Sequence, residues 1–210
     1  MSQPSKTECR QQARARLRTL TPDEIAAKSD AIREHLIAQV LDILPSGSGV
    51  ALFGGLRLEV DLLRLLPDLA ARNLRGYCFR VARDQMFAVE IASHDNLKRG
   101  TLQVWEPADS LPALTDLSRL TVILIPGLAF DPTNGARLGR GAGYYDRFLS
   151  QPDLQAHRIG VGFDCQIMTD IPMDLHDVRI DSLVTETGFS SHNWFGARLK
   201  SSQDSAQSGR

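Results

Sequence analysis

The sequence has no long hydrophobic run, few cysteines and almost no net charge. No apolar stretch approaches the roughly 18 consecutive residues that a membrane-spanning helix needs, and residues 1–10 lack the hydrophobic segment of a signal peptide. We therefore expect a cytoplasmic protein with no membrane partner. Cys9, Cys78 and Cys165 are odd in number and widely spaced, which fits neither a disulfide framework nor a C-x-x-C metal site. This pattern favours buried, reduced thiols.

The small net charge limits the kinds of partner that the chain can attract. Lys and Arg number 24, and Asp and Glu number 25, which gives a formal net charge of -1. A chain with this balance has no bulk attraction for nucleic acid or for an anionic membrane. Any site for an anion must therefore be built locally, from cations that the fold brings together.

Length and composition predict one globular domain. The chain has 210 residues, of which 42% are hydrophobic and 23% are charged, as is typical of globular proteins. At roughly 150 residues per domain, one large domain is the default expectation. Apolar periodicity is lost from about Ser190 onward. We expect residues 1–188 to form one α/β domain and residues 189–210 to form a partly disordered tail.

Two helical patterns open the chain. Residues 5–20 are rich in Arg, Gln and Ala and predict a basic helix. Thr21 is followed by Pro22 and, three residues after the threonine, by Glu24, which is the residue order of a capped helix start. Apolar residues at spacings near three and four continue from there until Pro45, and they predict a second helix.

Apolar and β-branched runs alternate with helical patterns along the rest of the chain. Strands are predicted at 49–53, 76–81, 86–91, 120–125, 157–163 and 178–184, and helical segments at 62–74 and 144–149. This alternation is typical of an α/β protein with an open, mostly parallel sheet flanked by helices. The expected fold is a single Rossmann-like domain of three layers.

Glycine is concentrated in one loop. Four of the 16 glycines lie within residues 135–143, in the run Asp131-Pro-Thr-Asn-Gly-Ala-Arg-Leu-Gly-Arg-Gly-Ala-Gly-Tyr-Tyr-Asp146. Glycines at alternate positions leave backbone N–H groups open to a ligand, and Arg137 and Arg140 add forked positive charge suited to phosphate or carboxylate. Because the loop follows a predicted strand, it lies where ligands bind in open α/β sheets. We expect an anion site here.

Two familiar phosphate-binding motifs are absent from the sequence. It has no GxxxxGK[ST] run, and its glycines do not follow the GxGxxG spacing with a dinucleotide-type acidic residue downstream. These absences disfavour a P-loop nucleotide hydrolase and an ordinary NAD-dependent enzyme.

The glycine-rich loop resembles the signature of the 5-formyltetrahydrofolate cyclo-ligase family, also called the methenyltetrahydrofolate synthetases. The resemblance rests on Pro126-Gly-Leu-Ala-Phe-Asp131 and on Arg137-Leu-Gly-Arg-Gly-Ala-Gly-Tyr-Tyr-Asp146. Supporting matches are Lys6 with Arg10, Phe53 with Glu59, Glu106 with Pro107, and a set of residues within 171–186. Together the matches span nearly the whole predicted domain.

The resemblance implies an ATP- and Mg²⁺-dependent ligase of one-carbon metabolism. Such an enzyme converts 5-formyltetrahydrofolate, with or without additional glutamates, into 5,10-methenyltetrahydrofolate, with release of ADP and phosphate. The γ-phosphoryl group passes to the formyl oxygen, N10 attacks the activated carbon, and phosphate leaves. Phosphoryl transfer depends mainly on positioning and charge stabilisation, which suits a loop of arginines and glycines. We expect a monomer or a weak homodimer with no nucleic-acid partner.

The same resemblance implies the residues of the ATP site. They are Lys6, Arg10, Arg137, Leu138, Gly139, Arg140, Gly141, Ala142, Gly143, Tyr144 and Tyr145. The first two lie one helical turn apart, so both side chains can face the same phosphates. Catalytic roles fall to Arg140, which would stabilise charge on the transferring group, and to Tyr144 and Tyr145.

The folate and metal positions are implied in the same way. The substrate-binding positions correspond to Gly54, Leu56, Glu59 and Tyr144. The carboxylate of Glu59 is suited to hydrogen-bond the polar edge of a pterin. Asp146 and Asp177 correspond to the Mg²⁺ positions, and one or two carboxylates with phosphate oxygens and waters are the usual ligands of this ion.

Two positions depart from the family pattern, and two other functions stay open. Ala142 stands where relatives often have lysine or glycine, so a lysine contact to phosphate is lost, and Arg80 replaces a proline near the expected substrate rim. These departures motivate a first alternative, a non-catalytic homologue that binds nucleotide or folate. The second alternative, permitted by fold analogy alone, is a phosphosugar-handling enzyme on a similar sheet.

Overall fold

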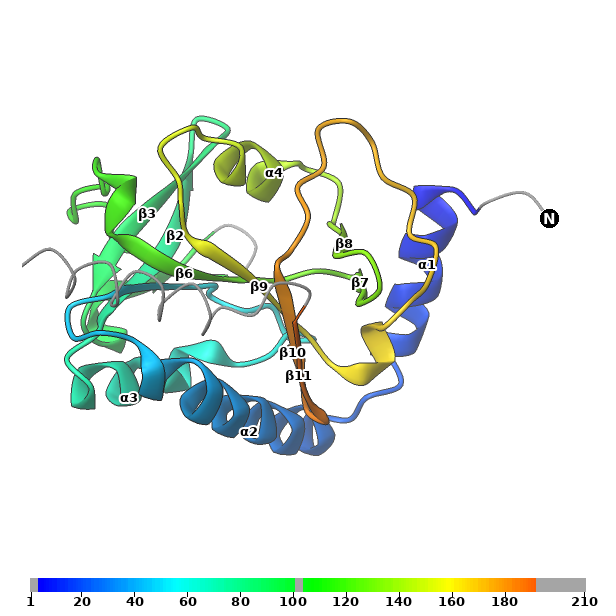
Figure 1. Ribbon diagram of the computed structural model, residues 1–210, viewed down its shortest axis with the longest axis horizontal. Coiled ribbons are helices and arrows are strands. Elements are labelled where there is room, and N and C mark those ends of the chain that lie inside the picture. The colour runs from blue at the N-terminus through cyan, green and yellow to red at the C-terminus, as the bar shows by residue number, and fades with distance from the viewer. Residues whose placement is uncertain (1–3, 101–103, 192–210) are drawn as a thin grey trace, which may run out of the picture.

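A seven-stranded sheet forms the centre of the molecule (Figure 1). The structure, a computed structural model, describes residues 4–100 and 104–191. Five strands run parallel, in the spatial order β2 (Arg75–Ala82), β1 (Gly49–Leu52), β6 (Leu120–Ile125), β9 (His157–Val161) and β10 (Ser182–Thr185). The edge strands pair antiparallel and are β3 (Gln85–Ile91) and β11 (Gly188–Ser191). The prediction of an α/β fold with a mostly parallel sheet is confirmed.

Side-chain caps determine where the first two helices begin. α1 (Lys6–Leu17) follows Ser5, whose hydroxyl accepts a hydrogen bond from the backbone N–H of Glu8 while the Glu8 carboxylate accepts one from the N–H of Ser5. Thr21 and Glu24 form the same reciprocal pair at the start of α2 (Pro22–Gln39). Each pair satisfies backbone donors that a helix start leaves free. The predicted cap at Thr21 is confirmed.

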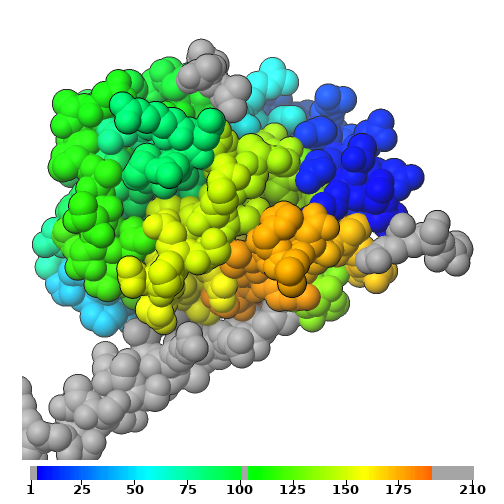
Figure 2. All heavy atoms as spheres, turned by 90° about the horizontal axis from the view of Figure 1, so that it is seen from above, coloured from blue at the N-terminus to red at the C-terminus, as the bar shows by residue number. Residues whose placement is uncertain are grey.

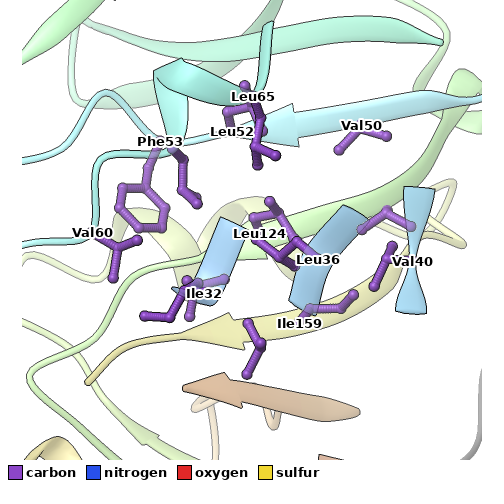
Figure 3. Close-up of a cluster of buried hydrophobic side chains, with 14 of the residues drawn as sticks. Ile32, Leu36, Val40, Val50, Leu52, Phe53, Val60, Leu65, Leu124 and Ile159 are labelled. Atoms are coloured by element: carbon purple, nitrogen blue, oxygen red, sulfur yellow. The ribbon is translucent and has the colours of Figure 1, made fainter. Parts of the chain in front are cut away.

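One face of the sheet is covered by α2 and α3 (Leu66–Ala71), with short 3₁₀ turns beside them. Ile32 and Leu36 of α2 and Val40 at its C-cap, each four residues from the next, cluster with Leu124 of β6 and Ile159 of β9 (Figure 3). This spacing places the three side chains along one side of a helix, and all of them are buried. The larger apolar core therefore lies between α2 and the sheet.

The helix predicted at 62–74 is divided in two. A 3₁₀ turn, η2 (Leu62–Leu65), runs directly into α3, and Pro67 occupies one of the first two positions of α3. Proline has no N–H to donate to the preceding turn, so a continuous α-helix cannot pass through this residue. The α2 pattern also ends earlier than predicted, because a second 3₁₀ turn, η1 (Leu41–Ile43), replaces its last turn.

The opposite face of the sheet is covered by α4 (Tyr144–Leu149) and the loops around it. Phe148 of α4 packs edge-on against Phe79 of β2, with 5.1 Å between the ring centroids. α1 lies on neither face but near the carboxyl ends of the strands, where it contacts the hairpin of β7 (Ala129–Asp131) and β8 (Ala136–Leu138) (Figure 1). It buries Cys9, Ala13 and Leu17 there.

Several short elements were not predicted from the sequence. They are β4 (Leu97–Arg99) paired with β5 (Trp105–Pro107), the β7–β8 hairpin, β11, and the 3₁₀ turns η3 (His94–Asn96), η4 (Leu117–Arg119) and η5 (Asp164–Gln166). The tail predicted to start at 189 begins inside β11, which pairs with β10 as far as Ser191. Residues 192–210 lie outside the described residues, so partial disorder of the tail stays a prediction.

The structure also tests what the sequence predicted about the cysteines and about membrane-spanning helices. All three thiols are free, and Cys9 and Cys78 are buried as predicted, whereas Cys165 is partly exposed. None of the helices in the described ranges is long and apolar enough to cross a membrane.

The packing of α2 yields a first prediction. Leu36→Ala removes a fully buried side chain from the core between α2 and the sheet. We expect the free energy of unfolding to fall by about 2–5 kcal/mol, because transfer energy is lost and a cavity remains. Urea denaturation followed by circular dichroism measures this change. Glu34→Ala, at an exposed position of the same helix, is the control, and an equal loss in both variants would contradict the packing argument.

Candidate active site

A cavity of about 400 Å³ opens at the carboxyl ends of the parallel strands. Residues that follow β1 and β6 form part of its wall. β1 and β6 are neighbours in the sheet. The chain continues from β1 to β2 on one side of this pair, and β9 lies next to β6 on the other side. Ligands in open α/β sheets bind where the strand order reverses in this way. The cavity therefore occupies the position that the topology favours for a ligand.

Every site residue predicted from the sequence lines this cavity. The set is Lys6, Arg10, Gly54, Leu56, Glu59, Arg137, Leu138, Gly139, Arg140, Gly141, Ala142, Gly143, Tyr144, Tyr145, Asp146 and Asp177. They come from segments far apart in the sequence. Figure 2 shows α1 (blue) beside the orange segment around residue 175, with the yellow-green segment that contains α4 next to them. The fold thus assembles one site from the two ends and the middle of the chain.

The glycine-rich loop needs glycine at two of its positions. Gly141 has φ +113° and Gly143 has φ +68°, a left-handed conformation that other residues adopt only with strain. Gly143 is also the residue from which α4 starts. The loop therefore turns tightly around the cavity before the helix begins.

Arg137 lies beneath the loop, and its side chain is 3% exposed. Its Nη2 donates to Asp146 Oδ1 at 2.8 Å, and its Nη1 donates to the carbonyl of Pro126 at 3.3 Å. Nε is buried and has no hydrogen-bond partner among the described residues. The guanidinium also lies over the ring of Tyr145, 5.6 Å from its centroid. Arg137 thus connects the loop to α4 while one donor stays unused.

Asp146 is the other partner in this buried pair. Its Oδ1 accepts from Arg137 and also, at 3.2 Å, from the backbone N–H of Val178. No hydrogen bond to Oδ2 occurs among the described contacts, and the residue lines the cavity. The carboxylate therefore has one oxygen held by the protein and one free to meet a cation.

Arg140 and Glu59 form an ion pair across the cavity. Arg140 Nη2 and Nε donate to Glu59 Oε1 at 2.6 and 3.0 Å, although the two residues lie 81 positions apart. Glu59 Oε2 accepts from the backbone N–H of Leu56 at 2.8 Å. The Glu59 side chain is 9% exposed and that of Arg140 is 41% exposed. The glutamate is thus fixed by its own loop, whereas the arginine reaches in from the solvent side.

α1 contributes two cations at one end of the cavity. Lys6 Nζ donates to Asp174 at 2.6 Å and to Asp177 at 2.5 Å, and Arg10 Nε donates to the carbonyl of Gly139 at 3.1 Å. Burial lowers the pKa of Lys6, but its two carboxylate partners raise it overall. Burial likewise raises the pKa of Asp177, but the bonds and charge of Lys6 lower it overall. Both groups are therefore charged at neutral pH.

Asp174, His176 and Asp177 form a small cluster of possible metal ligands. One ligand atom from each residue lies within 4.8 Å of the others. Asp174 and His176 are exposed, and Asp177 is partly buried. In this structure Lys6 forms ion pairs with the carboxylates of Asp174 and Asp177. Asp146 and Asp177 were predicted as a metal pair, and both line the cavity, but only Asp177 belongs to this cluster.

An apolar wall faces these charges and was not predicted from the sequence. Its side chains are Phe79, Val81, Met86 and Val104. Val81 and Met86 are register partners in the antiparallel β2–β3 hairpin, so they lie side by side. The alternation of side chains along each strand was visible in the sequence, but the pairing of β2 with β3 was not. A ligand with a flat apolar surface has room against this wall.

Two tyrosines border the apolar wall. The ring of Tyr145 packs edge-on against Phe79 at 5.4 Å, and burial raises the pKa of Tyr145 well above its usual range. The Tyr144 hydroxyl lies 3.5 Å from Asp84 Oδ1, and the Arg147 guanidinium lies 5.1 Å from the centre of the Tyr144 ring. Tyr145 is therefore a neutral phenol, available as a hydrogen-bond donor or as a packing surface.

Two further positions, Arg80 and Glu106, belong to the comparison with the sequence. Arg80 was expected near the substrate rim, and its guanidinium donates to the carbonyls of Ala108 and Leu111. Arg80 does not itself line the cavity, because alternation along β2 turns it to the side opposite Phe79 and Val81, and its effect on the substrate rim stays a prediction. Glu106 lines the cavity, and burial raises the pKa of its carboxyl group.

Gly54 has a structural reason to be glycine. A Cβ atom at this position would lie 1.8 Å from the carbonyl oxygen of Trp105, which is far inside contact distance. The loop after β1 therefore touches the backbone of β5 directly. Gly54 lines the cavity as predicted, and its lack of a side chain also permits this close approach.

Comparison with known proteins agrees with the geometry. A model of the 5-formyltetrahydrofolate cyclo-ligase family matches residues 2–186. The chain is 26% identical over 190 residues to the 5-formyltetrahydrofolate cyclo-ligase of Mus musculus, an alignment that covers 84% of this chain and 91% of the mouse protein. It is 37% identical over 134 residues to the one of Mycolicibacterium smegmatis, covering 60% of this chain and 66% of that protein.

A solved structure has the same fold. The NMR structure of Aquifex aeolicus 5,10-methenyltetrahydrofolate synthetase superposes with a TM-score of 0.74 at 25% identity, covering 89% of this chain and 92% of that one. The similarity in fold therefore covers most of this chain.

The Lys6–Asp177 pair yields a second prediction, which concerns pH. Because the folded pKa of Asp177 lies below its ordinary value of 3.8, the carboxylate stabilises the fold above that pH. The contribution is lost as the pH falls through the folded pKa. We expect Asp177→Asn to lower the free energy of unfolding near neutral pH and to have a progressively smaller effect below about pH 4.

Urea unfolding between about pH 3 and about pH 7 measures this difference. Asp174→Asn is the matched control, because its side chain is 59% exposed and surface ion pairs contribute little to stability. A difference between wild type and Asp177→Asn that is constant over the whole pH range would contradict the assignment.

Proposed function

The chain belongs to the 5-formyltetrahydrofolate cyclo-ligase family, and from this premise we propose that it catalyses the ATP- and Mg²⁺-dependent conversion of 5-formyltetrahydrofolate into 5,10-methenyltetrahydrofolate. The observation that carries the proposal is one cavity that combines cations, a glycine-rich loop, carboxylates and an apolar wall. A nucleotide, a divalent cation and a folate each find matching groups in it. Family membership leaves the phosphosugar alternative without support.

The phosphates of ATP suit the α1 side of the cavity. Lys6 and Arg10 project from one side of α1, and the loop around Gly141 bends toward Arg10. Fixed guanidinium groups and backbone N–H groups are effective donors to phosphate oxygens. The unused Nε of Arg137 is a further buried donor beneath the same loop. These residues would bind and orient the triphosphate.

The carboxylates around the cavity fit a magnesium ion. Asp146 has a free oxygen, and Asp177 and Asp174 lie beside Lys6. Carboxylate oxygens are hard ligands, and Mg²⁺ is usually held by one or two of them together with phosphate oxygens and waters. When bound, the ion would supply charge neutralisation for the phosphates. Lys6 would then be released from Asp177 and donate to phosphate instead.

The apolar wall and Glu59 suit the folate. Phe79, Val81 and Met86 offer a surface for the pterin, and the neutral phenol of Tyr145 lies next to it. The carboxylate of Glu59 is fixed by Leu56 and can accept hydrogen bonds from the amino group of a pterin. The ring would thereby be oriented with its formyl group toward the glycine-rich loop.

The proposed reaction needs no nucleophilic side chain. The formyl oxygen attacks the γ-phosphorus, the bond to the β-phosphate oxygen breaks, and ADP leaves. N10 then attacks the formyl carbon and loses its proton, the bond from that carbon to the phosphorylated oxygen breaks, and inorganic phosphate leaves. Arg140 would stabilise negative charge on the transferring group, which is the part of phosphoryl transfer that a protein can assist most.

The enzymatic proposal is tested by direct assay. Purified protein supplied with 5-formyltetrahydrofolate, ATP and Mg²⁺ is expected to form the methenyl chromophore and ADP in equal amounts, because each ring closure consumes one γ-phosphoryl group. Absorbance and coupled ADP detection measure the two products, and removal of Mg²⁺ with EDTA should stop both. If both ligands bind and no ATP-dependent product forms, the chain is the non-catalytic homologue that Ala142 suggests.

The role of Arg140 is tested by substitution. Arg140→Ala is expected to lower kcat by about 10²–10³ while changing folate affinity far less, because the lost interaction is strongest when charge develops. Steady-state kinetics and calorimetric titration with folate separate the two effects. Arg147→Ala, which changes a nearby arginine of α4 outside the cavity lining, is the control. If Arg140→Ala mainly lowers the melting temperature, the arginine is structural.

A further inference from the structure

β5 places a carboxylate at the edge of the apolar wall. Glu106 and Val104 lie two residues apart in an extended segment, so their side chains point to the same side, and both line the cavity. The backbone N–H of Val81, another residue of the wall, interacts with the same carboxylate. Glu106 therefore lies beside the surface proposed for the pterin. None of the proposed roles for ATP, Mg²⁺ or the folate uses it.

The β4–β5 hairpin leaves room for this carboxylate. Gly100 donates its backbone N–H to the carbonyl of Val104 at 2.8 Å, which ties together the two ends of the turn between the strands. A Cβ atom at Gly100 would lie 2.5 Å from Glu106 Oε1, well inside contact distance. The absence of a side chain at this position thus lets the hairpin backbone pack directly against one carboxylate oxygen.

Glu106 differs from the other carboxylates of the cavity in its charge partners. The others each form an ion pair with an arginine or a lysine, and they are Glu59, Asp146, Asp174 and Asp177. Within the described part of the chain, no cation forms an ion pair with Glu106. Lys98, its register partner in the β4–β5 pair, binds Asp109 instead, and the Arg80 guanidinium donates to two backbone carbonyls.

This environment makes Glu106 a stronger proton acceptor than an ordinary glutamate. Burial raises the pKa of its carboxyl group above the usual 4.5, and the negative charge of Asp109 acts in the same direction. The charges of Lys98 and Arg80 and the N–H of Val81 lower the pKa, but they do not cancel the rise. Carboxylates tuned upward in this way serve enzymes as general bases.

Other titratable groups of the cavity are less suited to accept a proton from the pterin. Burial raises the pKa of Tyr145 well above its usual range, so this phenol keeps its own proton. His176 belongs to the exposed cluster with Asp174 and Asp177, beside Lys6, where the phosphates are proposed to bind. Glu106 alone combines the apolar wall with a carboxylate that lacks a cationic partner among the described residues.

Ring closure releases a proton next to this wall. When N10 attacks the formyl carbon, the new N–C bond leaves N10 positively charged while its hydrogen is still attached. The proton has to pass to an acceptor, because the neutral nitrogen lone pair is needed to expel phosphate and form the methenyl bridge.

We propose that Glu106 is a catalytic residue and that its carboxylate accepts the N10 proton during ring closure. The N10–H bond breaks and its electron pair stays on nitrogen, while the proton binds a carboxylate oxygen of Glu106. The bond from carbon to the phosphorylated oxygen then breaks, and its electron pair leaves with phosphate. Glu106 returns the proton to solvent. The inference rests on the proposed function, and it gives Glu106 no part in the transfer of the γ-phosphoryl group.

The proposal is tested by separating the two halves of the reaction in one turnover. With full-length protein in excess over 5-formyltetrahydrofolate, rapid quench measures ADP and stopped-flow absorbance measures the methenyl chromophore. Glu106→Gln keeps the shape of the side chain but cannot accept the proton. We expect it to form ADP at the wild-type rate and to form the chromophore about 10²-fold more slowly. Glu90→Gln is the matched control, because Glu90 lies on β3 outside the cavity lining.

The pH dependence of chromophore formation is a second readout. Between about pH 5 and about pH 8, the wild-type rate should fall as the pH drops through the raised pKa, because the protonated carboxyl group cannot act as a base. Glu106→Gln should lack this fall. Asp109→Asn, outside the cavity lining, removes a nearby negative charge and frees Lys98 to approach Glu106. It should move the fall to lower pH while Glu106 itself is unchanged.

Three outcomes would overturn the proposal. Glu106→Gln could slow both products equally, which would make Glu106 a folate-binding or structural residue. It could leave both rates unchanged, which would make water the proton acceptor. The pH dependence could also stay the same in Glu106→Gln and in Asp109→Asn. Failure of the enzymatic proposal looks different, because wild type itself would then form neither ADP nor chromophore.

Discussion

Parallel pairing of β1 with β6 is the constraint on which the site depends. The pairing brings the carboxyl ends of both strands to one edge of the sheet, so the loop after β1 and the loop after β6 must meet there. Glu59 and Arg140 can form an ion pair across 81 positions only because of this arrangement. A register slip by one residue would exchange the two faces of β6 and remove the apolar contacts with α2. The core and the cavity are thus fixed by the same strand pairing.

The cavity brings several cations together in a chain that is nearly neutral overall. Arg137, Arg140 and Lys6 each have a carboxylate partner: Asp146, Glu59 and Asp177. Removing one partner of a buried ion pair destabilises a protein, because the remaining charge is left without compensation. Another anion that takes the place of the lost partner restores the compensation. Under the proposed function, phosphate would replace Asp177 as the partner of Lys6, and the released carboxylate would become available to the metal. Binding of one ligand would therefore prepare the site for the other.

The sequence allowed much of this structure to be predicted. The strand at 120–125 and the helix at 144–149 have the predicted bounds, because each is a short, strongly patterned segment between clear turn signals. The glycine-rich loop was found from composition, and its relation to Lys6 and Arg10 came only from the resemblance to a family. Nothing in the residue types alone brings the first helix to a loop more than 120 positions away.

The features that could not be predicted from the sequence depend on which strands and loops are neighbours in the fold. The apolar wall arises because β2 and β3 form an antiparallel hairpin with Val81 opposite Met86, and alternation does not reveal which strand is the neighbour. Gly54 is glycine because the backbone of Trp105 touches it, and this contact belongs to two segments at once. A depression beside the cavity, lined by Arg14, Arg18 and Arg57, was missed for the same reason. Arg57 joins Arg14 and Arg18 only when the loop after β1 meets the end of α1, so this depression follows from the strand pairing that also creates the cavity.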